Sequence, residues 1–186
     1  MRIVAGRWRG RALLAPKGAA TRPTADRLRQ ALFDMLLHAP WGGHDRVTGA
    51  TVLDAFAGTG ALGLEALSRG AAQAHFIERD RAALAALRAN IATLDAPAHV
   101  HAADTTRPPP GIACGLVFLD PPYGQGLVET ALARLSAAGW FAPGALVVAE
   151  TGRDEALAAW GDVLAERRHG AARITVMRAP AHAAPA

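Results

Sequence analysis

Two hydrophobic periodicities divide the chain. From residue 51 onward, short apolar runs alternate with segments in which apolar residues recur at helical spacing. The runs predict strands at 51–55, 74–78, 98–102, 113–120, 145–150, 163–168 and 172–178, and the intervening segments predict helices at 60–69, 80–91, 127–137 and 154–160. Strands that alternate with helices are typical of an α/β fold with a doubly wound, mostly parallel sheet. The short turn at His169-Gly170 predicts that the last two strands form an antiparallel pair at one edge.

The first fifty residues follow a different pattern. Residues 2–14 mix apolar and basic positions and are broken by Gly6 and Gly10, which favours two short strands. Residues 15–23 indicate a loop, and Thr24 is expected to cap a helix that runs to about His38. We therefore expect a basic N-terminal extension of a small β-hairpin and a helix (1–40), a linker (41–50), a core (51–178) and a flexible tail (179–186).

Composition narrows the class of protein. The chain has 186 residues, of which 51% are hydrophobic and 19% charged, and this excludes an intrinsically disordered protein. The single cysteine, Cys114, excludes an intrachain disulfide framework, and its apolar strand predicts a buried, unreactive thiol. The seven histidines lack metal-binding spacing, so no metal is expected. No apolar run is long enough for a bilayer, and the first residues do not resemble a signal peptide, so we expect a cytoplasmic protein without membrane contact.

Positive charge is concentrated at the N-terminus. The first thirty residues hold eight cations and one acid, a net charge of +7, which leaves −3 for the remainder of a chain with a total of +4. Such asymmetry suggests a basic arm that faces a polyanion. Arg7, Arg9 and Arg11 would share one face of a strand and grip phosphates. The alternative is a solvated edge that only prevents strand pairing. The residues expected to contact this polyanion are Arg7, Trp8, Arg9, Arg11, Arg22, Arg27 and Arg29.

A glycine-rich loop follows the strand at 51–55. The segment from Asp54 to Gly63 contains G-x-G-x-x-G between a strand and a helix, the context in which this motif binds a nucleotide. Glu78 ends the next strand, where a carboxylate can accept the hydroxyls of an adenosine ribose. A tight turn without a ligand is the alternative.

The acids near this loop bear on which ligand it holds. NAD and S-adenosylmethionine share the adenosine, but Asp54 would repel a pyrophosphate and favour a sulfonium with its ammonium group. Asp104, after the third strand, can either accept from the adenine amino group or cap its own loop.

The tetrapeptide Asp120-Pro-Pro-Tyr123 ends the fourth strand of the core. Open α/β sheets bind ligands at the carboxyl ends of their strands. The prolines fix the backbone and remove two N–H donors, so Asp120 and the Pro121 carbonyl form a pair of acceptors that fits an exocyclic amine. Tyr123 offers a flat face on which a flipped base can stack. A proline-rich turn alone is weak support, and the glycine loop strengthens it.

Together these motifs resemble class I S-adenosylmethionine methyltransferases that methylate planar exocyclic nitrogens. Three N-terminal runs narrow the resemblance to the RsmD family, namely Gly6 to Arg11, Thr21 to Thr24 and Asp26 to Phe33. The likeness continues through Ala61 to Gly70, Val117 to Tyr123 and Arg168 to Gly170, and so covers nearly the whole chain in order. Two positions depart from the family pattern, since His169 replaces the usual tyrosine and Gln30 the usual glutamate.

The resemblance implies a Rossmann-like methyltransferase that modifies N2 of a guanine, of the guanine-966 type, in 16S ribosomal RNA. Its partner would be the small ribosomal subunit or an assembly intermediate, and the enzyme a monomer. The implied S-adenosylmethionine-binding residues are Asp54, Phe56, Gly58, Gly60, Glu78 and Asp104. The implied residues at the target base are Asp120, Pro121, Pro122 and Tyr123.

We expect direct in-line methyl transfer, with Asp120 as a hydrogen-bond acceptor and orientation of the two reactants as the main source of catalysis. Three alternatives remain at this stage: a DNA adenine-N6 methyltransferase, an NAD-dependent oxidoreductase and a non-catalytic RNA-binding module. Transfer to adenine in duplex DNA, binding of NADH, or RNA binding without transfer would distinguish them.

Overall fold

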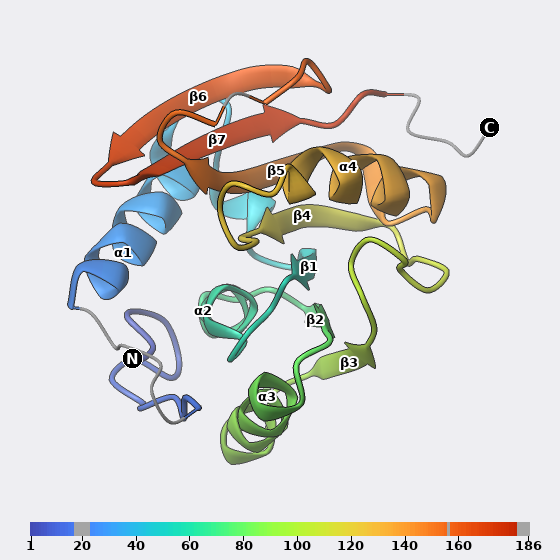
Figure 1. Cartoon of the computed structure of the whole chain (residues 1–186). Coiled ribbons are helices and arrows are strands. Elements are labelled where there is room, and N and C mark those ends of the chain that lie inside the picture. Colours follow the sequence, from blue (N-terminus) through green and yellow to red (C-terminus); the bar gives the residue numbers. More distant parts are fainter. Residues whose placement is uncertain (17–22, 156, 182–186) are drawn as a thin grey trace.

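A seven-stranded mixed sheet forms the centre of the molecule, with the strand order β3-β2-β1-β4-β5-β7-β6 (Figure 1). The computed structural model describes residues 1–16, 23–155 and 157–181. Strands β1 to β5 are parallel neighbours, and β7 lies antiparallel between β5 and β6. The strands are β1 (Thr51–Ala55), β2 (Gln73–Glu78), β3 (Ala98–Ala102), β4 (Cys114–Leu119), β5 (Phe141–Gly152), β6 (Asp162–His169) and β7 (Ala172–Arg178). The predicted α/β fold with a parallel sheet and an antiparallel edge is confirmed.

Helices cover both faces of the sheet. The described helices are α1 (Pro23–His38), α2 (Ala61–Ser68), α3 (Arg81–Leu94), α4 (Leu127–Ala137) and the 3-10 turn η1 (His44–Arg46). Helices α1, α2 and α3 contribute to one hydrophobic cluster and α4 to the other. Of the helices in the described ranges, none is both long and apolar enough to cross a membrane.

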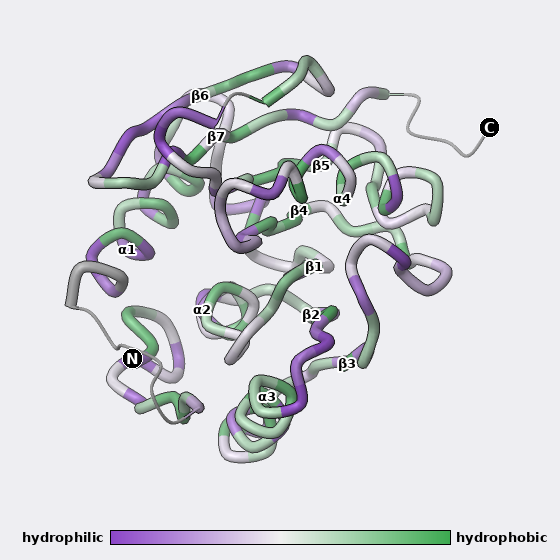
Figure 2. Tube along the Cα trace, in the orientation of Figure 1, coloured by the Kyte–Doolittle hydropathy of each residue, from purple (hydrophilic) through white to green (hydrophobic). Residues whose placement is uncertain are grey.

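Strand β4 shows how side-chain alternation builds these two layers. Leu116 and Phe118 belong to the cluster under α1 to α3, whereas Val117 and Leu119 belong to the cluster under α4. All four side chains are almost fully buried, as expected for a central parallel strand whose two faces are both covered. The tube in Figure 2 is accordingly green along much of β4, and it turns purple after β2, where Glu78, Arg79 and Asp80 line the cavity described below.

Most predicted elements lie within three residues of their observed bounds, and four details differ. Helix α1 begins at Pro23, one residue before the expected cap Thr24, because proline suits the first helical position. Strand β5 starts at Phe141, four residues early. The linker contains the unpredicted turn η1. The helix expected at 154–160 is wrong for the described residues, because the Ala158 N–H donates across to Glu129 on α4 at 2.8 Å.

The two N-terminal strands are also wrong. Residues 2–14 form a hairpin with a single antiparallel bridge between Arg2 and Ala12, and residues 7–10 form a turn. Gly6 and Gly10 have φ of 79° and 85°, which reverses the chain and limits the pairing of the two arms to this bridge and the backbone hydrogen bonds beside it. Arg7, Arg9 and Arg11 therefore do not alternate along one strand face. Part of the predicted 15–23 loop (17–22) and of the tail (182–186) lies outside the described residues.

Candidate functional site

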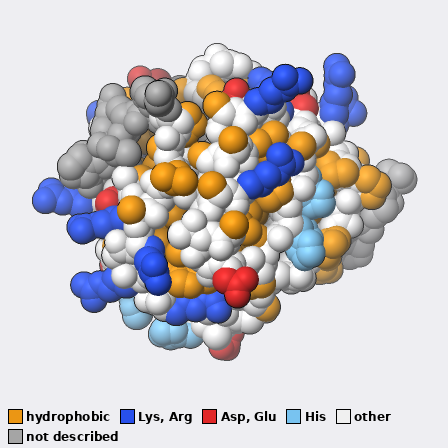
Figure 3. Space-filling model, turned by 90° about the horizontal axis from the view of Figure 1, so that it is seen from below, with side chains coloured by type: hydrophobic (Ala, Val, Ile, Leu, Met, Phe, Trp, Pro, Cys, Tyr) orange, Lys and Arg blue, Asp and Glu red, His pale blue; other side chains and the backbone are white. Residues whose placement is uncertain are grey.

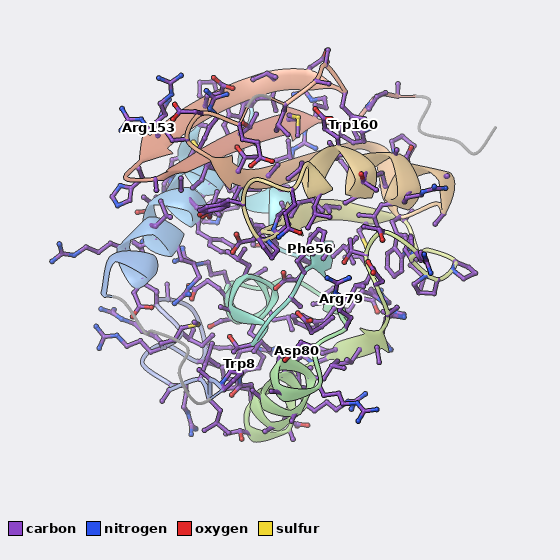
Figure 4. All side chains as sticks on the ribbon, in the orientation of Figure 1. Trp8, Phe56, Arg79, Asp80, Arg153 and Trp160 are labelled. Atoms are coloured by element: carbon purple, nitrogen blue, oxygen red, sulfur yellow. The ribbon has the colours of Figure 1, made fainter. Side chains whose placement is uncertain are left out.

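A cavity of about 640 Å³ lies at the carboxyl ends of β1, β2, β3 and β4. This is the edge at which open α/β sheets bind ligands, and the volume is within the range of about 300–1,000 Å³ for small-molecule sites. Phe56, Arg79 and Asp80, labelled in Figure 4, belong to its wall, whereas Arg153 and Trp160 lie on the β6–β7 side. The lining residues are Phe56, Ile77, Glu78, Arg79, Asp80, Ala103, Asp104, Thr105, Asp120, Pro121, Pro122, Tyr123 and Leu127.

The Glu78 carboxylate accepts backbone hydrogen bonds from the two loops that border this cavity. Its Oε2 accepts the N–H of Gly58 at 2.7 Å, and its Oε1 accepts the N–H groups of Arg79 and Asp80, each at 2.7 Å. These three bonds fix the carboxylate while it remains half-buried at the wall. A carboxylate has about four acceptor positions, so capacity remains for a ligand hydroxyl.

The glycine loop is shaped by packing as well as by backbone conformation. Gly58 has φ 54°, which favours glycine, and open space surrounds the place where its side chain would be. A Cβ at Gly63 would lie 2.4 Å from Phe76 Cε1, so this glycine permits close contact between α2 and β2. Phe56 adopts φ 74°, a strained conformation for a side chain of its size, and it lines the cavity.

Asp54 lies under this loop and outside the lining of the cavity. It is 1% exposed, and its Oδ2 accepts the N–H of Gly63 at 2.8 Å. Burial raises the pKa of its carboxyl to about 7, and the charge of Glu78 adds to this rise, while the Gly63 hydrogen bond opposes it. In the structure Asp54 therefore anchors the start of α2, and Gly58 and Gly60, like Asp54, do not line the cavity.

Asp104 has one of the two roles weighed from the sequence, because it caps its own loop. Its Oδ1 accepts the N–H and the hydroxyl of Thr106, and these bonds lead the causes that lower the pKa of its carboxyl. Its Oδ2 accepts from Arg79 at 2.7 Å. Asp104 thus caps its own loop, and it also lines the cavity beside Thr105.

The tetrapeptide brings a second carboxylate to this edge of the sheet. Strands β4 and β5 are paired with Leu119 opposite Ala149, so Asp120, just after the end of β4, lies beside Glu150, which is still within β5. The Tyr123 hydroxyl donates a hydrogen bond to Glu150 Oε1, and burial together with this bond raises the pKa of the phenol. Tyr123 itself is 44% exposed.

The side chain of Glu155 forms hydrogen bonds with the loop that carries Tyr123. The Glu155 carboxylate accepts the N–H groups of Gly124, Gly126 and Gly152 at 3.1–3.3 Å. These hydrogen bonds lower the pKa of Glu155, so the carboxylate remains ionised. Sequence reasoning missed this residue, because two of its three partners, Gly124 and Gly126, are distant in the chain.

A smaller cavity of about 180 Å³ lies on the other side of Asp120. Apolar side chains make up most of its wall, and Asp120, Glu150 and Arg29 are the charged residues there. The lining residues are Met1, Leu28, Arg29, Leu32, Ala61, Leu62, Leu119, Asp120, Val148, Glu150 and Ile174. Asp120 therefore lines both cavities.

The Asp120 side chain is exposed, and it borders both cavities. Loss of surrounding water raises its pKa to about 7, and the charges of Glu150 and Asp54 contribute to this rise. Reactive sites often contain a carboxyl whose pKa is raised toward neutral pH, and Asp120 has such a pKa between the two cavities.

The arginines expected to contact RNA have different environments. Arg7, Arg9, Arg11 and Arg27 are exposed, and Arg7 stacks over the half-buried Trp8 ring at 4.0 Å. Arg29 requires a correction, because it is 5% exposed and its guanidinium contacts the Arg2 carbonyl, Asp26 and Glu65. It packs the N-terminal segment against α1 instead of facing solvent. Arg22 lies outside the described residues.

Exposed cations gather along one side of the molecule. Seen from below, Figure 3 shows more blue than red, with many of the blue side chains toward the side on which Figure 1 places the N-terminal hairpin. A groove between this hairpin and α1 is lined by Arg2, Arg9 and Arg27 together with Asp26 and Asp34. Gln30, one of the two departures from the family pattern, lies in the same groove and accepts from Arg69 at 2.9 Å.

Comparisons with known proteins agree with this geometry. Residues 1–178 match the family described as Conserved hypothetical protein 95. The chain is 44% identical over 154 residues to ribosomal RNA small subunit methyltransferase D of Escherichia coli K12, covering 81% of this chain and 74% of that one. It is 36% identical over 164 residues to the protein of the same name from Haemophilus influenzae, covering 84% and 81%.

The solved structures that resemble this chain include proteins named as methyltransferases. The chain superposes on yhhF of Escherichia coli with a TM-score of 0.83 and 37% identity, over 98% of this chain and 99% of that one. The 16S rRNA N2 G1207 methyltransferase of Thermus thermophilus, solved with AdoMet and guanosine, has a TM-score of 0.63 and 20% identity, over 88% and 44% of the two chains. This second likeness concerns the fold alone.

Proposed function

This chain belongs to the Conserved hypothetical protein 95 family, the RsmD family of ribosomal RNA methyltransferases, and on that premise we propose that it methylates N2 of a guanine in 16S ribosomal RNA. The proposed target is a guanine of the guanine-966 type in the small ribosomal subunit or an assembly intermediate. The proposed enzyme acts as a monomer in the cytoplasm, where ribosomes are assembled.

One observation carries the proposal: Asp120 lines both the larger and the smaller cavity. A methyl donor in one cavity and a base in the other would meet at this carboxyl. The prolines that follow it add a backbone carbonyl with no competing N–H, so two acceptors can face one amine. A pair of acceptors directs both hydrogens of an exocyclic amine, and its lone pair is then free to face the donor.

The residues of the larger cavity fit S-adenosylmethionine. Glu78 is a fixed, half-buried carboxylate with acceptor capacity for the ribose hydroxyls, and Asp104 retains capacity on Oδ2 for the adenine amino group. Phe56 and Ile77 supply apolar surface for the adenine ring. When bound, S-adenosylmethionine supplies a methyl group on a cationic sulfonium, and the acidic lining of this cavity favours a cation. Asp54 and the glycines support the site by fixing the loop that carries Phe56.

Asp120 orients the amine and stabilises the positive charge that develops on it as the methyl group arrives. The amine proton leaves after transfer, so Asp120 need not remove it beforehand. Tyr123, held by its bond to Glu150 and by the Glu155-supported loop, offers an exposed ring on which the base can stack. Alignment of two reactants in this way can supply up to about 7–11 kcal/mol of the barrier reduction.

The test is transfer of labelled methyl groups from S-adenosylmethionine to small ribosomal subunits from a strain that lacks this gene. The RNA is digested to nucleosides and analysed, and Asp120→Ala is assayed in parallel. We expect label in N2-methylguanosine with the wild-type protein and at least about 10²-fold less with the variant. Label in another nucleoside, in DNA adenine or in protein would contradict the proposal.

A further inference from the structure

We infer that Glu150 is a specificity-determining residue, which recognises the target guanine by accepting a hydrogen bond from its N1–H in the smaller cavity. This inference rests on the proposed guanine-N2 reaction and adds a residue that the sequence motifs do not include. Three observations lead to it, namely the position of Glu150 beside Asp120, the character of the cavity, and the hydrogen-bonding edge of guanine.

The sheet register places the two carboxylates together. Leu119 pairs with Ala149 in the parallel β4–β5 ladder, so Asp120 and Glu150 occupy the next, adjacent positions. Parallel neighbours lie about 4.8 Å apart, and side chains at paired positions point to the same face of the sheet. Both line the smaller cavity, together with residues from α1 and α2.

The smaller cavity suits a single base. Its volume of about 180 Å³ is below the range of about 300–1,000 Å³ for sites that hold a whole small-molecule ligand. Leu32, Val148 and Ile174 supply apolar walls, and Asp120 and Glu150 are the two carboxylates among the lining residues. Arg29 also lines this cavity, but its guanidinium contacts Asp26, Glu65 and the Arg2 carbonyl.

Guanine is the standard base whose edge matches two adjacent acceptors. It presents N2–H₂ and N1–H side by side, so Asp120 can accept from the reacting amine while Glu150 accepts from N1–H. Adenine presents its amine beside the N1 lone pair, which would face the Glu150 carboxylate without a proton between them. A carboxylate that faces a lone pair is unfavourable, and sites that hydrogen-bond a substrate N–H reject analogues lacking it by roughly 10⁴-fold.

Tyr123 gives Glu150 a fixed orientation. Its hydroxyl donates to Oε1, which leaves Oε2 as the oxygen available to a base. Tyr123 lines the larger cavity, so this contact links that cavity to the carboxylate that would recognise the base in the smaller one. Glu150 therefore acts on the choice of base, whereas Glu155 acts only on the backbone of the loop.

The experiment compares two acceptor bases in one assay. Small subunits are reconstituted with 16S rRNA that carries either guanine or 2-aminopurine at the methylated position. 2-Aminopurine keeps the N2 amine but replaces N1–H by a lone pair. Rates of methyl transfer are measured for the wild type, Glu150→Gln, Glu150→Ala and the matched control Glu155→Gln. The ratio of rates on the two bases cancels differences in the active fraction of each preparation.

We expect the wild type to favour guanine by about 10²-fold or more, and Glu150→Gln, whose amide can donate to the N1 lone pair, to reduce this ratio at least about tenfold. Glu150→Ala should reduce it as well, whereas Glu155→Gln should slow both bases alike and keep the wild-type ratio. A wild-type ratio in both Glu150 variants would overturn the inference and leave the proposed function intact. Absence of N2-methylguanosine with the wild type would overturn both.

Discussion

At the scale of single residues, two carboxyls with raised pKa have different tasks. Asp54 is almost fully buried and bonded to the Gly63 N–H, so its environment supports the loop. Asp120 reaches both cavities and has Glu150 as a neighbour. The pKa of each rises to about 7 mainly through loss of water, yet of the two only Asp120 lines the cavities described above.

Asp54 predicts how stability depends on pH. The pKa of an unperturbed aspartate is 3.8, whereas the pKa of Asp54 in the folded protein is about 7, so the folded state binds the proton more tightly. Its contribution to stability is complete below about pH 4 and is lost as the pH rises through about 7. Asp54→Asn keeps an acceptor for Gly63 and removes the titration. We expect the Tm of the wild type to fall by several degrees more than that of the variant between pH 5 and pH 8, at about 2–4 °C per kcal/mol.

Thermal unfolding followed by circular dichroism checks this difference, and the free protein is used so that ligands do not contribute. Asp80→Asn is the control, because Asp80 caps α3 through the Ala83 N–H at the surface. Its Tm profile should parallel that of the wild type. If the Asp54→Asn and wild-type profiles were parallel as well, the buried proton would be located elsewhere.

Several site residues could be predicted because their signals are local. Glu78, Asp104 and the tetrapeptide each lie at or just after the end of a strand, and the structure brings all three to one cavity. Glu150 lies near the end of β5, and the same rule applied to that strand could have found it. Burial of Arg29 could not be predicted, since it depends on Glu65, thirty-six positions away in the chain.

At the scale of elements, strands were predicted well and the irregular segments were not. Apolar runs such as 114–119 form strands because both faces of a central strand are buried. The N-terminal hairpin instead follows partners on α2: Glu65 accepts the N–H groups of Val4 and Ala5 at 2.7 and 3.0 Å, and the Ser68 carbonyl accepts that of Arg7 at 2.8 Å. Such long-range bonds leave no periodicity in the sequence.

The segment after β5 shows the same limit. Its apolar spacing favoured a helix, but Glu155 accepts backbone N–H groups of the Tyr123 loop and Ala158 donates to α4. Through these hydrogen bonds the segment supports the loop of the candidate site, and no helix forms in its described residues. When a segment next to a site does not adopt the secondary structure that its sequence favours, this is a common sign of function.

At the scale of the whole molecule, the N-terminal segment joins the basic surface to the catalytic body. Ile3 and Leu13 are buried in the same hydrophobic cluster as α1, α2 and one face of the sheet, so the hairpin is fixed relative to the cavities. Exposed arginines on the hairpin would then position RNA by its phosphates while the base enters the smaller cavity.

Removal of three exposed arginines tests this arrangement. We expect Arg7→Ala, Arg9→Ala and Arg11→Ala combined to weaken RNA binding and to reduce the slope of log K against log salt by about one per lost phosphate contact. Arg167→Ala with Arg168→Ala, exposed on strand β6 and outside the hairpin, is the control and should leave the slope near that of the wild type. Titrations at several salt concentrations measure both. An unchanged slope in the triple variant would make the hairpin a solvated edge without RNA contact.

The central claim is that Asp120 acts where the two cavities meet, on the transfer step and not on retention of the donor. The most direct measurement compares Asp120→Asn with the wild type in two quantities, the Kd for S-adenosylhomocysteine by calorimetry and the single-turnover rate of methyl transfer to small subunits. We predict a Kd within about threefold of the wild type and a rate lower by about 10²-fold or more. Loss of affinity and rate by the same factor would contradict the claim, because Asp120 would then serve the donor cavity alone.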